Sequence, residues 1–115
     1  MGEHAFTTFD KAATHNTTMP LLQAMYSEFK ELSKKKPDAA VSKSKIHIVN
    51  RLLEKIRVVL IDEESIGFLD LLDEEAIPQA SDVTLILSQY VAAMTAFQSK
   101  HHGWNGAEHG WFIKK

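Results

Sequence analysis

Three histidines near the C-terminus are the residues whose chemistry stands out first. His101, His102 and His109 lie close together in the sequence, and imidazole is a good ligand for Zn, Ni and Cu. Adjacent histidines point in different directions on most backbones, and the spacing lacks the i, i+4 pair of helical zinc sites. We therefore keep a metal- or ligand-binding tail as an alternative function and expect no bound cofactor.

Carboxylates form two runs, 62–64 and 73–75, which are the candidates for Mg²⁺ or Ca²⁺ binding or for acid–base catalysis. Neither run has the alternating spacing of a calcium-binding loop, and the sequence contains no phosphate-binding glycine loop and no G-x-S-x-G turn. It also has no cysteine, which excludes disulfides, thiolate metal sites and a cysteine nucleophile. These observations favour a function that is not enzymatic.

Charge is segregated along the chain. Residues 34–57 are strongly basic, whereas 62–82 carry only acidic charges, and blocks of this kind can pair within a fold or between subunits. Lys43, Lys45 and Arg51 are the candidates for contacts with nucleic acid, which makes a nucleic-acid-binding regulator a second alternative. The net charge of −2 and the apolar residues around these three side chains argue against it.

The spacing of apolar residues predicts the elements that position these groups. It predicts helices over 20–35, 43–62 and 82–100, and a short helix over 65–75. A strand is the competing interpretation for 58–61, because β-branched residues are frequent there. A strict seam lies in the second helix, where residues repeat at intervals of three and four: Ile46, Val49, Leu53, Ile56 and Leu60.

The helix predicted over 82–100 carries no charged residue between its two ends. A surface helix of a soluble protein normally has charged side chains on its outer face, so we expect this helix to be covered on most sides. The second helix is apolar nearly all round over residues 56–61, and a chain of 115 residues has difficulty covering both helices alone. We therefore predict self-association through this helix, helped by two tryptophans of the tail. The predicted interface residues are Val83, Leu87, Tyr90, Met94, Phe97, Trp104 and Trp111.

The predicted fold is all-α: a compact bundle of three long helices and one short helix over 18–100. Flexible arms flank it at 1–17 and 101–115, and the second arm contains the histidines and tryptophans. No signal sequence or spanning segment is recognisable, so we expect a cytoplasmic protein without membrane contact. The predicted function is a small non-enzymatic interaction or adaptor domain that binds a protein partner or forms a homo-oligomer.

Overall fold

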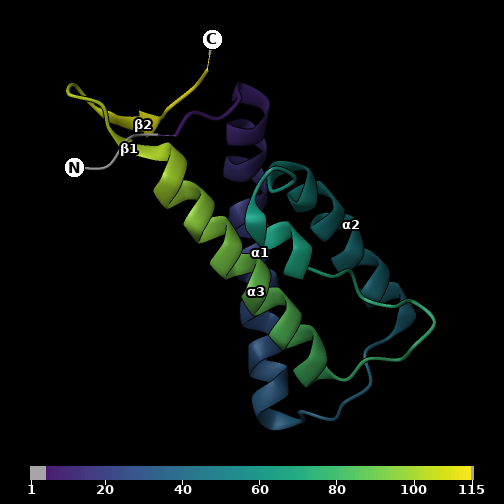
Figure 1. Cartoon of the computed structure of the whole chain (residues 1–115). Coiled ribbons are helices and arrows are strands. Elements are labelled where there is room, and N and C mark those ends of the chain that lie inside the picture. Colours follow the sequence, from purple (N-terminus) through teal and green to yellow (C-terminus); the bar gives the residue numbers. More distant parts are fainter. Residues whose placement is uncertain (1–4, 115) are drawn as a thin grey trace.

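The computed structural model describes residues 5–114 and is mostly helical, as predicted (Figure 1). It contains three α-helices where the sequence analysis expected four helices, and it adds a small antiparallel sheet. None of the helices within this range has the length and apolar character needed to cross a membrane. In chain order the elements are α1 (Phe9–Lys35), α2 (Lys43–Val59), the 3₁₀ helix η1 (Glu64–Phe68), α3 (Ala80–His101), β1 (His102–Trp104) and β2 (His109–Trp111).

Helix α1 begins much earlier than predicted. It starts at Phe9, so the extended arm expected over 1–17 is wrong from that residue onward, and residues 1–4 of that arm lie outside the described range. The Thr8 hydroxyl caps the helix by accepting a hydrogen bond from the Lys11 amide at 3.1 Å. A single side-chain cap of this kind satisfies one of the four free amides at a helix start.

Polar residues on the core side of α1 explain why the sequence did not predict a helix over the first part of α1. His15 and Thr18 are buried at positions where a helical pattern calls for aliphatic residues. The His15 Nε2 atom donates to the Met94 carbonyl at 2.9 Å. The Thr18 hydroxyl donates to the Thr14 carbonyl at 2.7 Å. Both polar groups are therefore satisfied inside the protein, which makes their burial tolerable.

Helix α2 follows the predicted seam. Ser42 caps its start by accepting from the Lys45 amide at 3.3 Å. The helix ends at Val59, so the strand interpretation of 58–61 is wrong. All the seam residues are almost completely buried: Ile46, Val49, Leu53, Ile56 and Leu60.

The chain between α2 and α3 is not helical after η1, so the helix predicted over 65–75 is wrong beyond Phe68. The Asn50 side chain accounts for the difference. Its amide donates to the Leu72 carbonyl at 2.8 Å, and its oxygen accepts from the Leu72 amide at 2.9 Å. Because a side chain takes up both backbone groups of Leu72, this stretch needs no helix, and Leu69 and Leu72 enter the core.

The C-terminal region is a β-hairpin, in which β1 and β2 pair antiparallel. His102 lies opposite Trp111, and Trp104 lies opposite His109, so the repeated His-Gly-Trp triplet forms two cross-strand histidine–tryptophan pairs. The Asn105 side chain closes the turn by accepting from two backbone amides at 2.9 and 3.0 Å. The hairpin lies at the end of α3, beside the start of α1 (Figure 1).

The two ends of the described chain are hydrogen-bonded to each other beside the hairpin. The Thr7 amide donates to the Phe112 carbonyl, and the Thr7 carbonyl accepts from the Lys114 amide, both at 2.8 Å. The Phe112 amide donates to the carbonyl of His101 at 2.8 Å. The flexible arms predicted at both ends are therefore wrong within the described range, because these segments are hydrogen-bonded to each other and to α3. Lys115 lies outside that range.

Candidate functional site

An open apolar hollow of about 860 Å³ lies between α1 and α2. It adjoins a second hollow of about 300 Å³ with which it shares Met25, Glu28, Phe29 and Ile48. We call the two joined hollows the α1–α2 groove. The α1 side of the larger hollow is built from Ala13, Thr14, Thr17, Thr18, Leu21 and Ala24, and the α2 side from Arg51, Leu52 and Lys55.

The floor and walls of the α1–α2 groove offer apolar surface rather than free polar groups. The Thr17 hydroxyl donates to the Ala13 carbonyl at 3.1 Å, and Thr18 is bonded within α1 in the same way. Leu21 and Ile48 keep 55% and 49% of their surface exposed, which is high for aliphatic side chains beside the core. Covering apolar surface of this kind is favourable by about 25 cal/mol per Å². Covering the exposed apolar surface of the groove would therefore lower the free energy.

One rim of the α1–α2 groove is cationic. Lys45, Arg51 and Lys55 border it from α2, whereas Glu28 is the single carboxylate that lines it from α1. No ion pair within residues 5–114 engages Lys45, Arg51 or Lys55. These positive charges are consequently available to acidic groups of another molecule.

The predicted nucleic-acid contacts separate in the structure. Lys43 lies outside the groove and forms an exposed ion pair with Glu75 at 3.7 Å. Lys45 and Arg51 face the groove, where apolar side chains surround them. Cations beside an apolar floor suit an amphipathic protein segment better than a phosphate backbone, which needs positive charge without an apolar surface.

Five of the predicted interface residues lie in the core of the single chain. They are at most 1% exposed, and they are Val83, Leu87, Tyr90, Met94 and Phe97. Helix α1 extends further than predicted and packs along α3, so it supplies the cover that the sequence analysis assigned to a second subunit. The absence of charge on the inner side of α3 is thereby explained within one chain.

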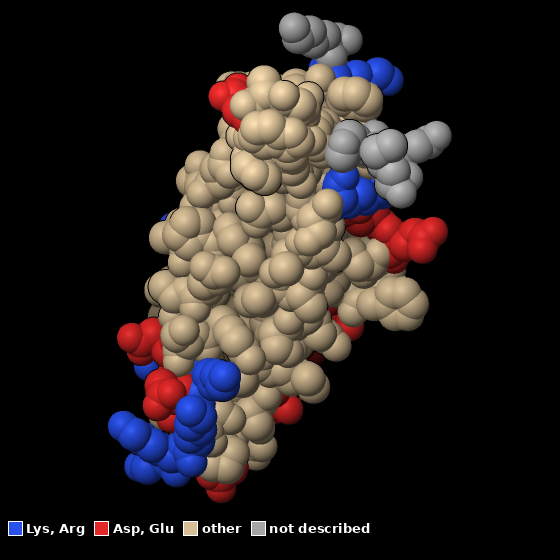
Figure 2. All heavy atoms as spheres, turned by 90° about the vertical axis from the view of Figure 1, so that its left-hand side faces the viewer, with Lys and Arg blue, Asp and Glu red and all other residues tan. Residues whose placement is uncertain are grey.

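The outer face of α3 is also free of charge. Figure 2 shows the side of the molecule on which α3 lies; the middle of this face has no Lys, Arg, Asp or Glu atoms. Leu85 is 61% exposed, and Gln89 and Ala92 are exposed one and two turns further on. The Ser88 hydroxyl donates back to the Leu85 carbonyl at 2.6 Å. The exposed residues of this face between Leu85 and Ala96 are all uncharged, and two of them are alanines.

The two tryptophans of the predicted interface differ in burial. Trp111 is half-buried, with its ring centroid 4.9 Å from that of His15 and 5.8 Å from that of Phe97. Its Nε1 donates to the Asn16 side chain at 3.1 Å, so Trp111 anchors the hairpin to α1. Trp104 is 53% exposed and remains available to a partner.

The three predicted metal ligands diverge. His101 is buried at the end of α3, whereas His102 and His109 pack edge-on against Trp111 and Trp104 with centroid distances of 5.1 and 5.3 Å. Among residues 5–114, no three His, Cys, Asp or Glu side chains gather in a group that could hold a metal ion.

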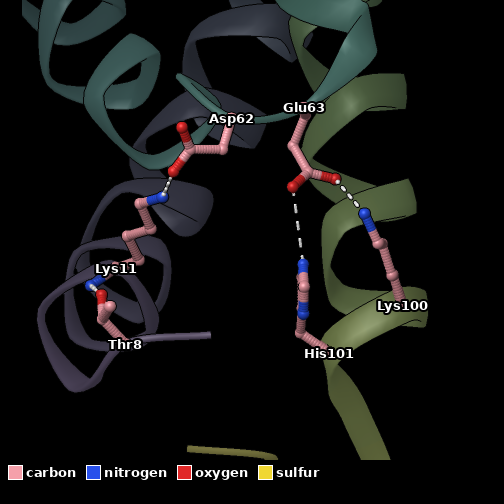
Figure 3. A network of polar contacts seen from close by, with 6 residues as sticks. All are labelled: Thr8, Lys11, Asp62, Glu63, Lys100 and His101. Carbon is pink, nitrogen blue, oxygen red and sulfur yellow. Dashed lines mark hydrogen bonds and ion pairs between the residues drawn. The ribbon is translucent and has the colours of Figure 1, made fainter. Parts of the chain in front are cut away.

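A polar network joins α1, the turn after α2 and the end of α3 (Figure 3). Lys11 pairs with Asp62 at 2.6 Å, and Glu63 lies between Lys100, at 3.3 Å, and the Nε2 atom of His101, at 3.5 Å. The carboxylates of this network already contact cationic groups or an imidazole of the same chain. We interpret it as a structural connection between elements that are far apart in sequence.

Comparison with protein-family models, with curated proteins and with solved structures found no match for this chain. Ile48 lies off the main seam of the second helix, and the sequence does not show that it remains half exposed. This exposure depends on how α1 and α2 pack against each other. For the same reason, the spacing of apolar residues does not show that Leu21 on α1 is exposed.

Proposed function

We propose that this protein is a non-enzymatic interaction domain whose α1–α2 groove binds an amphipathic, acidic segment of a protein partner. The observation that supports the proposal is an apolar floor, with Leu21 and Ile48 half exposed, beside a cationic rim without internal ion pairs. Apolar area supplies affinity, and the rim selects negative charge on the partner.

The dimensions of the groove suit a short segment, either a helix or an extended stretch of chain. Its α2 side extends from Lys45 to Lys55, which corresponds to roughly 15 Å at 1.5 Å per residue. About three turns of a partner helix match that length, with apolar anchors at i, i+3, i+4 and i+7. Acidic residues on the flank of such a helix would lie against Arg51 and Lys55.

The lining also favours binding over catalysis. Within the described residues it contains no histidine, and its single carboxylate, Glu28, has no nucleophile hydrogen-bonded to it. The Thr17 and Thr18 hydroxyls donate to α1 carbonyls. General-base activation of a hydroxyl requires a base within hydrogen-bond reach, and the groove supplies none.

Fluorescence anisotropy with two labelled model peptides tests the proposal. Both are helices of about five turns with the same leucine face, and one carries glutamates on its flanks where the other carries lysines. We expect the glutamate peptide to bind at least about tenfold more tightly, and Leu21→Glu to weaken its binding by at least about tenfold. Leu85→Glu is the matched control, because Leu85 is a leucine of similar exposure on α3. Equal binding of both peptides, or equal loss in both variants, would contradict the proposed function.

A further inference from the structure

We infer that a second copy of this chain occupies the α1–α2 groove, through its own acidic segment 64–77; the inference rests on the proposed function of the groove. This segment comprises η1 and the stretch that follows it. It carries apolar and acidic side chains on one exposed piece of chain, which is the chemistry that the groove fits.

The acidic segment exposes large apolar side chains. Phe68 and Ile77 are 79% and 74% exposed, and Leu71 is 38% exposed. Their neighbours Leu69 and Leu72 are buried in the core. The segment is therefore anchored by one set of side chains and presents another set outward, as a docking element must.

Both partners of the contact carry charges that the single chain does not pair. On the segment, Glu64 and Asp70 have no ion pair within the described residues, and in the groove the same holds for Arg51 and Lys55. Pairs between the segment and its own α2 involve other residues, such as His47 with Glu74 at 3.3 Å. The unpaired acids and bases complement one another in sign.

The acidic segment is also held in one conformation before it binds. In addition to the two bonds from Asn50, Arg57 donates to the Leu69 carbonyl, and the Tyr90 hydroxyl donates to the Asp70 carbonyl at 3.0 Å. Burial raises the pKa of Tyr90, so its phenol remains a donor. A segment ordered in advance loses little conformational entropy on docking, which favours affinity.

The contact must form between chains rather than within one. Asn50 fixes the segment to α2, whereas Ile48 lines the groove, and two residues along a helix point about 160° apart. The segment and the groove thus lie on different sides of α2. A second copy can bring its segment to this groove, and reciprocal contact gives a closed dimer, whereas one-sided contact gives a longer assembly.

Sedimentation velocity on the full chain, at concentrations up to about 0.5 mM, tests the inference. We expect reversible self-association that weakens at least about fivefold when the salt concentration rises from about 0.05 to about 0.5 M, because salt screens exposed charge pairs. The groove variant Arg51→Glu/Lys55→Glu and the segment variant Glu64→Lys/Asp70→Lys should each associate at least about tenfold more weakly than the wild type. An equimolar mixture of the two variants should recover association, since each supplies the charge that the other now fits. Circular dichroism establishes that both variants are folded.

Several outcomes would overturn the inference. A wild-type chain that stays monomeric over this range while the groove still binds the glutamate peptide refutes it and leaves the proposed function intact. A chain that neither associates nor binds the peptide refutes both. Association that is insensitive to salt and is lost only in Leu85→Glu would assign self-association to the outer face of α3 instead, as the charge-free helix first suggested. Weakening in both charge variants without recovery in the mixture would also exclude this pairing.

Discussion

Replacing Asn50 by alanine tests how the acidic segment is attached to the helices. Asn50 is 6% exposed, and its side chain bonds both backbone groups of Leu72, at 2.8 and 2.9 Å. Asn50→Ala leaves one buried N–H and one buried C=O without a protein partner. Each such group costs about 1–3 kcal/mol, and water entering the space of the lost amide recovers part of that cost. We expect the free energy of unfolding to fall by about 2–4 kcal/mol.

Urea unfolding followed by circular dichroism and by tryptophan fluorescence measures this loss. For a chain of this size, with a urea dependence of about 2 kcal/mol per M, the midpoint should fall by roughly 1–2 M. Asn50→Asp separates hydrogen bonding from side-chain volume, because a carboxylate still accepts from the Leu72 amide but faces the Leu72 carbonyl without a donor. It should destabilise the protein as well, although its shape is nearly that of asparagine. Glu54→Ala, at an exposed position on the same helix, is the control and should change the stability by less than about 0.5 kcal/mol.

Two results would refute this reasoning. A midpoint for Asn50→Ala equal to that of Glu54→Ala would mean that the paired bonds to Leu72 contribute nothing. A midpoint for Asn50→Asp equal to that of the wild type would mean that the donated bond is dispensable. If the reasoning holds, Asn50→Ala should also weaken self-association, because it loosens the segment that docks.

Two further predictions concern the histidines. Burial lowers the pKa of His15 below its ordinary value of 6.5, and its imidazole donates to the Met94 carbonyl. The unfolded chain therefore binds this proton more readily, so the stability from His15 is complete above about pH 6.5 and is lost as the pH falls through the lower pKa of the folded state. Urea midpoints at pH 7.5 and pH 5 should differ less in His15→Gln than in the wild type, and an equal difference would show that His15 does not titrate this way. Added Zn²⁺ should not raise the melting temperature, because His101, His102 and His109 face different neighbours; a stoichiometric stabilisation by Zn²⁺ would contradict this geometry.

The predictions from sequence succeeded where the pattern of apolar residues is local. The seam of α2 repeats at the helical period without interruption, and its members are the core residues observed. The prediction for the start of α1 was wrong because the polar residues His15 and Thr18 occupy core positions. The His15 imidazole is satisfied by a carbonyl of α3, and the Thr18 hydroxyl by a carbonyl of α1 itself. The partner of His15 lies on α3, 79 residues away. A polar residue with a non-local partner is invisible to a periodicity argument.

The C-terminal hairpin had a signal that could have identified it. Asn105 is followed by Gly106, which adopts a positive φ of 99° in the turn, and Asn-Gly is a frequent turn pair in hairpins. The two His-Gly-Trp triplets flank this turn and pair with each other. An antiparallel pairing of identical triplets places each histidine opposite a tryptophan, so the duplication itself is consistent with two facing strands.

The α1–α2 groove could not be located from the sequence, because an uncovered surface is a property of packing. Leu21 and Ile48 belong to helices whose other apolar residues are buried, and nothing in their spacing distinguishes them from core residues. The charges were more informative. The separation of a basic block from an acidic block was visible in the sequence, and the structure shows which members of each block remain without ion pairs.

A second copy could dock on two surfaces, the α1–α2 groove and the outer face of α3, and these differ in apolar area and in charge. The charge-free character of α3 first suggested that helix, but α1 covers its inner side, and exposed alanines leave its outer side little apolar area to bury. The groove exposes Leu21 and Ile48 around a hollow and adds three cations that form no ion pair within residues 5–114. Because the free energy of association follows apolar area and charge complementarity, the groove gains more per unit of surface covered than the α3 face does. Salt dependence separates the two surfaces experimentally, since only the groove contact depends on charge.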